Sequence, residues 1–176
     1  MEAETQAGEG GMTRSIAAGK ARPLPARERL RMRIEHEVDT RSAGFGVWLL
    51  RLTRGRAARL WHRQALILTT RGRRTGRERT VPLQFFPDGD DLIVVAADSG
   101  LASPPGWYFN LMAAPQARVE VFGRTYQVNA RELPEREADA FWRRVLGVAP
   151  DYARYSRRLG RRPALIRLAP GERGRL

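Results

Sequence analysis

The chain has 176 residues and carries 32 Lys and Arg against 19 Asp and Glu, a net charge of +13. It has no cysteine, and its two histidines, His36 and His62, lie far apart in sequence, which argues against disulfides, thiolate metal sites and a histidine-based catalytic triad. With 42% hydrophobic residues the composition is typical of one globular domain, and no apolar run approaches the roughly 20 residues of a membrane-spanning helix.

Residues 1–25 are Gly, Ala, Glu and Pro with little periodicity, which predicts a disordered tail. Residues 26–63 are predicted to form an N-terminal helical segment, because apolar residues recur at helical spacing between Arg27 and Thr40 and again in residues 44–53. The basic stretch 54–63 that follows either packs onto the rest of the protein or, with these helices, forms a membrane-surface element.

Strand patterns follow in close order at residues 65–70, 80–86, 91–97, 117–122, 124–131 and 163–169. The turn Pro87–Asp90 makes the second and third strands a hairpin, and Gly123 does the same for the fourth and fifth. Pro82 indicates an edge or a bulge in the second strand, because proline donates no ladder hydrogen bond.

Helices are predicted at residues 104–114, 134–147 and 151–159, with Gly147 closing the second. Strands joined mostly by hairpins, with few and peripheral helices, favour a mainly β (α+β) fold: a small antiparallel barrel of about six strands over residues 64–176.

The most unusual stretch is LTTRGRRTGRERTVPL, residues 68–83, which places five arginines and two glycines between two strands. Glycine allows a backbone to approach a ligand closely, and arginine forks match phosphate and carboxylate oxygens. Neither a Walker motif nor a dinucleotide-binding fingerprint is present. The stretch is therefore either a cradle for an anion or a solvated, charged turn, and charge alone does not decide between them.

The segment GWYFN, residues 106–110, is the second candidate. Core packing of a short helix under the barrel is the better explanation for at least one of Trp107 and Tyr108. Asn110 is harder to explain as a core residue, because a buried amide needs hydrogen-bond partners.

Four stretches in order, LTTRGRRTGRERTVPL, FPDGDDLIVVAADSG, GWYFNLMAAPQARVEV and APDYARYSRR, together resemble the deazaflavin (coenzyme F420)-dependent nitroreductase and quinone reductase family. The resemblance extends over about residues 47–170. It implies a split β-barrel of the FMN-binding-like type. It also implies an oxidoreductase that transfers hydride from reduced F420 to a quinone, a nitroaromatic or a similar electron-poor acceptor.

The resemblance also implies site residues. Those expected to hold the phosphate and the acidic tail of F420 are Arg73, Arg74, Thr75 and Arg79. Those expected to run along the cofactor are Thr80, Val81, Pro82, Leu83 and Gln84. Those expected near the ring system are Ala96, Ala97, Asp98 and Ser99, with the pocket completed by Gly106, Trp107, Tyr108, Phe109 and Asn110. Tyr152 and Tyr155 match tyrosines that border the substrate site, where they either donate a proton or wall the pocket. No metal site is expected.

The sequence departs from the family pattern in three places. Asp98-Ser99 stands where Ser-Lys is usual, the following loop has two prolines and no lysine, and Ala149 replaces a tyrosine. The first two changes bear on the strength of cofactor binding, and the third alters the substrate pocket.

Three other functions stay open. The first is an FMN-dependent oxidoreductase of the same barrel class, with FMN as the second choice of cofactor. The second is a non-enzymatic basic protein that binds nucleic acid or an anionic membrane. Because every basic residue except Lys20 is arginine, a skew typical of GC-rich genomes, the charge is weak evidence for nucleic acid. The third is a degenerate family member that only carries the cofactor. The expected location is the cytoplasm, with peripheral contact at the inner face of the membrane through residues 26–63. A homodimer is also considered.

Overall fold

The computed structural model describes residues 44–54, 64–97 and 103–171. The predicted disordered tail, residues 1–25, lies outside these ranges, as does the helix expected between Arg27 and Thr40. Of the predicted N-terminal helical segment, residues 44–52 are described and are helical.

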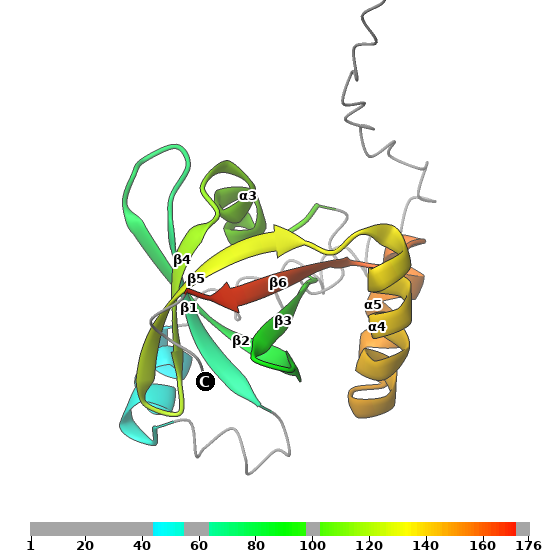
Figure 1. Ribbon diagram of the computed structural model, residues 1–176, viewed down its shortest axis with the longest axis horizontal. Helices are drawn as coiled ribbons and strands as arrows, with labels where there is room; N and C mark the ends of the chain where they lie inside the picture. Colours follow the sequence, from blue (N-terminus) through cyan, green and yellow to red (C-terminus); the bar gives the residue numbers. More distant parts are fainter. Residues whose placement is uncertain (1–43, 55–63, 98–102, 172–176) are drawn as a thin grey trace, which may run out of the picture.

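The described chain forms a closed antiparallel barrel with the strand order β1-β2-β3-β6-β5-β4 (Figure 1). The strands are β1 (Ala65–Arg71), β2 (Glu78–Asp88), β3 (Asp91–Ala96), β4 (Gln116–Val121), β5 (Arg124–Glu132) and β6 (Ala164–Pro170). All six predicted strands and both predicted hairpins are confirmed, and with them the fold class.

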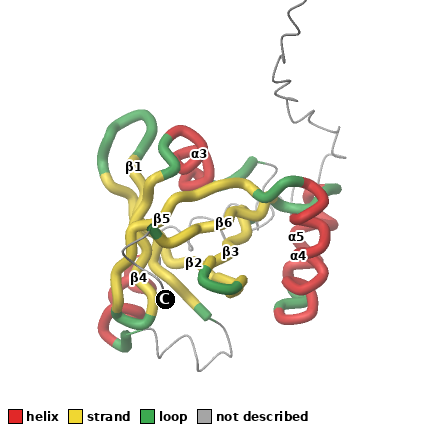
Figure 2. Tube along the Cα trace, viewed as in Figure 1, coloured by secondary structure: helices red, strands yellow, loops and turns green. Residues whose placement is uncertain are grey.

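Three labelled helices surround the barrel: α3 (Gly106–Ala113), α4 (Glu135–Val148) and α5 (Tyr152–Leu159). Figures 1 and 2 show α3 at one end of the barrel beside the β1–β2 loop, and α4 with α5 together on one side. Helical residues 44–52 lie at the other side, against β4 (Figure 1). None of the helices in the described ranges has the length and hydrophobicity to cross a lipid bilayer.

The end of α4 differs from the prediction. Gly147 does not close the helix, which continues to Val148 with Ala149 as its C-cap. Ala149 is 2% exposed, and its N–H still bonds to the Val145 carbonyl. The chain turns there because Ala149 is packed beneath the helix and Pro150 follows, which disfavours helical backbone at the preceding residue.

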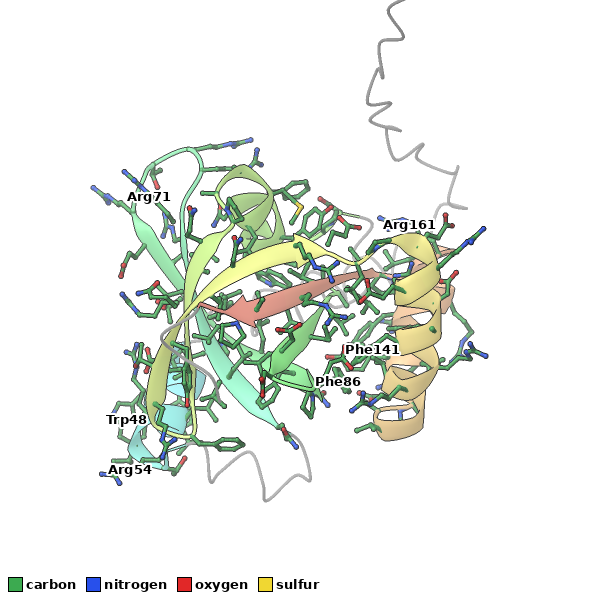
Figure 3. All side chains as sticks on the ribbon, viewed as in Figure 1. Trp48, Arg54, Arg71, Phe86, Phe141 and Arg161 are labelled. Carbon is green, nitrogen blue, oxygen red and sulfur yellow. The ribbon has the colours of Figure 1, made fainter. Side chains whose placement is uncertain are left out.

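Two apolar layers explain why β3 reads as an unbroken hydrophobic run. Successive strand residues point to opposite faces, so Leu92 and Val94 face the barrel interior while Ile93 and Val95 face outward. The outward pair is covered by α4. The outer cluster comprises Phe86, Ile93, Val95, Leu133, Ala138, Phe141, Val145, Ala149 and Leu165. Phe86 and Phe141 lie in the space between the barrel and α4 (Figure 3).

The strand β2 has two halves. Residues 78–84 pair with β1, whereas pairing with β3 begins only at Phe85. The Phe85 N–H bonds to the Gln64 carbonyl on the β1 side, and main-chain groups alternate between the two edges of a strand. Pro82 therefore presents its main chain to the other edge, where no strand of the described ranges lies beside it. The expectation of a strand edge at Pro82 is confirmed, because this half of β2 is paired on one side only in the described ranges.

Candidate functional site

The arginine loop (Arg71–Arg79) is folded tightly by its own main chain. The Gly72 N–H donates to the Arg77 carbonyl at 2.8 Å, and the Gly76 N–H donates to the Gly72 carbonyl at 2.7 Å. Gly76 has a φ of 67°, a conformation that other residues rarely adopt. A Cβ on Gly72 would lie 3.0 Å from both the Arg77 carbonyl oxygen and Thr75 Oγ1. Both glycines are thus required by the fold of the loop.

The charges of this loop are not neutralised by the described parts of the chain. Its five arginines are all exposed, and none forms an ion pair with a described residue. Its one acid, Glu78, is held instead by Arg118 of β4, with Nη2 3.1 Å from Oε2. Figure 3 shows the loop, with Arg71, extending beyond the barrel wall. The loop is therefore an exposed patch of positive charge.

Asn110 ties α3 to the arginine loop. Its Nδ2 donates to Thr70 Oγ1 at 3.1 Å, and its Oδ1 accepts the Arg73 N–H at 3.1 Å. Asn110 is 8% exposed and Thr70 is 2% exposed. The buried amide thus finds partners at both ends, and its role in the structure is to hold the main chain of the loop. Next to it, the Arg73 guanidinium lies 4.9 Å from the ring centroid of half-buried Phe109.

The first half of β2 leads away from this loop. Arg79 is exposed, and every residue from Thr80 to Gln84 is half-buried. Val81 and Leu83 pack against the inner core, so the alternate residues Thr80, Pro82 and Gln84 point outward. The helical residues 44–52 approach this outer face, because a Cβ on Gly46 would lie 3.4 Å from Pro82 Cγ.

An aromatic cluster (Phe86, Trp142, Tyr152, Tyr155) lies at the far end of β2. The Tyr152 ring centroid is 6.0 Å from that of Phe86, 6.3 Å from that of Trp142 and 5.4 Å from that of Tyr155, all in edge-to-face geometry. Thr80 and Phe86 are separated by roughly 20 Å along the strand, at about 3.3 Å per residue. The predicted cationic and tyrosine sites therefore stand at opposite ends of one strand.

Some of the predicted site residues have a different environment. Ala96, Trp107 and Tyr108 are 4%, 7% and 6% exposed, and their side chains belong to the inner core. Contact between these side chains and a bound cofactor is therefore not supported, and core packing accounts for them. The Tyr108 hydroxyl donates to Glu132 Oε2 at 2.7 Å. Burial and this hydrogen bond raise the pKa of Tyr108 to about 12, so it stays protonated in the physiological range.

The remaining predicted residues belong to the arginine loop, the start of α3 and the segment that follows β3. Thr75 is exposed on the arginine loop, and Gly106 is exposed at the start of α3. Ala97 is half-buried and packs against the outer cluster. Asp98 and Ser99 lie outside the described residues.

The sequence did not single out Arg118, which binds the acid of the arginine loop, or Phe86 and Trp142, which contact Tyr152. Arg118 reaches Glu78 because the β1–β4 register sets it opposite Thr69, which no local pattern reveals. Phe86 and Trp142 read as ordinary core positions until α4 and α5 are placed. The described ranges contain no group of acidic, histidine or cysteine residues that could hold a metal ion.

A closed six-stranded antiparallel barrel with peripheral helices defines a split-barrel protein of the FMN-binding-like class. A solved structure of an F420-H2 dependent reductase (FDR-A) shares this fold with a TM-score of 0.55 and 29% identity, covering 60% of this chain and 94% of that one. A structure described as a domain-swapped dimer has a TM-score of 0.56 over 82% of this chain and 99% of its own, and at 23% identity it shows the fold alone.

The family model for F420H(2)-dependent quinone reductase matches residues 43–168. The F420H(2)-dependent quinone reductase Rv1261c of Mycobacterium tuberculosis is 36% identical over 103 residues, which cover 53% of this chain and 69% of that protein. The chain therefore belongs to the F420H(2)-dependent quinone reductase family and is an oxidoreductase.

Proposed function

We propose that the protein transfers hydride from reduced coenzyme F420 to a quinone or to another flat, electron-poor acceptor such as a nitroaromatic. The observation that carries the proposal is the arginine loop, which no described acid neutralises and which stands where the open edge of β2 begins. The match of the chain to the family supports the same function.

The donor set of the loop fits F420 better than FMN. F420 carries a phosphate and an acidic oligoglutamate tail, whereas FMN carries one phosphate. The five exposed arginines of the loop supply more positive charge than a single phosphate needs. The bond between Arg118 and Glu78 also keeps the one acid of the loop engaged.

In this proposal Arg73, Arg74 and Arg79 hold the phosphate and the tail through charge-assisted hydrogen bonds, and Thr75 adds a hydroxyl. Arg71 and Arg77 remain solvated charge. Asn110 acts indirectly, since its bonds hold the loop main chain at Thr70 and Arg73.

The open main-chain edge of β2 over residues 80–84 lies along the cofactor, whereas the outward face at Pro82 is approached by helical residues 44–52. Ala97, Asp98 and Ser99 are placed near the ring system, and Gly106 with Phe109 completes the pocket. When bound, reduced F420 supplies the hydride, while the protein positions it and excludes water.

The acceptor occupies the aromatic cluster at the far end of β2. Phe86 is 3% exposed and supports the Tyr152 ring from below, so the half-buried rings of Trp142 and Tyr152 form the wall that borders a flat ring in this proposal. The Tyr152 or Tyr155 hydroxyl either donates the proton that the reduced acceptor takes up or only borders the ring. Both tyrosines are half-buried, which is compatible with either role.

Titration of the purified protein with oxidised F420, FMN and FAD tests the cofactor. We expect F420 to bind most tightly. Binding of FMN without measurable F420 affinity would show that the cofactor is FMN, while the assignment to the barrel class would stand. Salt-dependent binding to random DNA without any deazaflavin binding would favour the basic binding protein instead.

The arginine loop allows a matched pair of variants. Arg74→Ala should weaken F420 binding by about 1.5–3 kcal/mol, roughly 10- to 100-fold, because a hydrogen bond to a charged group is lost. Arg77→Ala removes the same charge from the same loop and should change affinity by no more than about twofold, the effect of one exposed charge. Equal losses in the two variants would show that the loop acts only through its total charge.

Peripheral membrane contact through residues 26–63, of which the structure describes 44–54, is the finer proposal about partners. Phe45, Trp48 and Leu52 are 63%, 55% and 64% exposed, at spacings that place them on one helix face. Arg54 adds positive charge nearby, whereas Arg51 is paired with Glu120. Co-flotation with vesicles of 30% anionic lipid should be lost when Trp48 and Leu52 are both changed to Ser. A cytoplasmic location and a homodimer remain predictions.

A further inference from the structure

Six charged side chains form a network on the outer face of the barrel, and Arg167 of β6 is at its centre. The network comprises Asp88, Asp91, Arg131, Glu137, Arg144 and Arg167. The Arg167 Nη2 lies 2.9 Å from Asp88 Oδ2, and its Nη1 lies 2.8 Å from Asp91 Oδ2. Its Nη2 also bonds Glu137. One guanidinium thus engages three carboxylates.

These contacts join three elements that are distant in sequence. Asp88 and Asp91 face each other across the β2–β3 turn, and Glu137 lies in the first turn of α4. Arg144, farther along α4, reaches back to Asp88 at 3.4 Å. The network therefore ties α4 to the β2–β3 hairpin directly through Arg144 and Asp88, and indirectly through Glu137 and Arg167.

The physical role of the network is to fix geometry more than to add stability. The Arg167 side chain is only 14% exposed, and its buried Nε has no hydrogen-bond partner within the described residues. Removing a charged group from water offsets much of the attraction in a buried ion pair, and an unmade buried hydrogen bond adds a further cost. The contact of the Arg167 guanidinium with three carboxylates instead fixes the relative position of the elements that it joins.

Arg167 lies in register, across neighbouring strands, with Phe86, which supports the aromatic wall of the proposed acceptor site. In the register, Phe86 is opposite Ile93, and Ile93 is opposite Arg167. Neighbouring strands are about 5 Å apart, so Phe86 and Arg167 are roughly 10 Å apart on one face of the barrel. The Tyr152 ring contacts both Phe86 of β2 and Trp142 of α4. The Tyr152 ring can therefore keep both contacts only while α4 and β2 hold their relative positions.

We propose that Arg167 is a positioning residue for the acceptor: by holding α4 to the β2–β3 hairpin, it keeps Trp142 and Tyr152 packed over buried Phe86, where the two half-buried rings border a flat acceptor. The inference rests on the proposed function, because it assigns that wall to the acceptor. It makes no use of the arginine loop, which lies at the other end of β2. Acceptor and cofactor binding should therefore respond differently to its loss.

The test measures steady-state reduction of menadione by reduced F420, together with the Kd of F420, in Arg167→Gln. We expect the KM for menadione to rise about five- to tenfold, with kcat reduced less than threefold and the F420 Kd within twofold of the wild type. Arg143→Gln is the matched control, because Arg143 is an exposed arginine on α4 outside the network. An unchanged menadione KM in folded Arg167→Gln would overturn the proposal.

Two more variants separate positioning from stability. Val119→Ala removes a fully buried residue of the inner core away from α4. For Val119→Ala we expect a fall in Tm comparable to that of Arg167→Gln, without a change in the menadione KM. An equal rise in KM would overturn the proposal.

If Arg167→Gln does not fold, Asp88→Asn replaces it. This variant weakens the tie between the hairpin and α4 but leaves Arg167 paired with Asp91 and Glu137. A raised menadione KM in Asp88→Asn supports the proposal, and an unchanged one overturns it. If the proposed function is wrong, the wild-type protein will not bind F420 or will not reduce menadione, and this outcome is distinct from those above.

Discussion

The two ends of β2 offer different kinds of recognition. At the Glu78 end, the arginine loop is exposed, charged and held by a few hydrogen bonds, with Asn110 as its main anchor. At the Phe86 end, aromatic rings pack edge to face over an apolar cluster beneath α4. One strand thus connects the proposed anion site with the proposed acceptor site.

The difference has a measurable consequence. Attraction between exposed charges is screened within about 8 Å at physiological ionic strength, whereas burial of apolar surface is not weakened by salt in this way. Cofactor affinity should therefore fall as salt increases, and the acceptor KM should respond much less. The predictions below test whether the two ends behave independently.

The largest effect is expected from Asn110→Ala at the charged end. The substitution removes the bonds to Thr70 Oγ1 and to the Arg73 N–H and leaves the buried Thr70 hydroxyl without its donor. We expect F420 affinity to fall about thirtyfold, or about 2 kcal/mol, with little change in the menadione KM. Isothermal titration measures the affinity, and Asn129→Ala, at an exposed β5 position, is the control. Unchanged F420 affinity would show that the loop keeps its shape without Asn110.

The next effect is expected at the aromatic end, from Tyr152. Tyr152→Ala removes the ring contacts with Phe86, Trp142 and Tyr155. Each aromatic pair contributes about 0.5–1.5 kcal/mol, so we expect the menadione KM to rise about tenfold. F420 affinity should be retained. Tyr152→Phe keeps the ring and distinguishes the two roles of the hydroxyl. A fall in kcat would assign it to proton donation, and an unchanged kcat would leave it as part of the wall.

A smaller effect is expected between the two ends, where residues 44–52 dock on the barrel. Arg51 forms a bidentate pair with Glu120, with Nε 2.9 Å from Oε2 and Nη2 2.6 Å from Oε1. The hydrogen bond from Arg51 lowers the pKa of Glu120 below its ordinary value of 4.5. The pair therefore contributes stability that is present at neutral pH and is lost as the pH falls below about 4.5.

Glu120→Gln should reduce the free energy of unfolding at pH 7 by about 0.5–1 kcal/mol, since Arg51 is half exposed. The difference from the wild type should shrink as the pH is lowered from 5 to 3, as measured by urea denaturation. A difference that stays constant over that range would contradict the ionic origin of the effect.

The smallest effect is expected from Arg118. Arg118→Gln releases Glu78, which pairs in register with Arg71, so that its carboxylate can neutralise an arginine of the loop. F420 affinity should fall by about twofold at low salt, because an exposed pair contributes less than about 1 kcal/mol. The double variant with Glu78→Gln should recover the wild-type affinity. Failure of the double variant to recover it would mean that Arg118 acts on the cofactor in another way.

Local chemistry decided much of the fold. The alternation of apolar residues, the turn at Pro87–Asp90 and the glycine at position 123 were enough to predict six strands and two hairpins, because strand period and turn preference are properties of neighbouring residues. Pro82 likewise marked a strand edge, since a missing N–H is tolerated only where no partner strand needs it. The motifs in their order also indicated the family that the comparisons show.

Tertiary structure decided which of these residues meet. The sequence could not show that Asn110 bonds across to Thr70 and Arg73, or that Trp107 and Tyr108 fill the core. It also left Arg167 as one arginine among many, although it binds three carboxylates from distant parts of the chain. By itself the sequence determined the elements and the charge of the loop, because these depend on residues within a few positions of one another. The separation of a charged end from an aromatic end along β2 follows only from strand register and from the packing of α4 and α5, which bring together residues far apart in the chain.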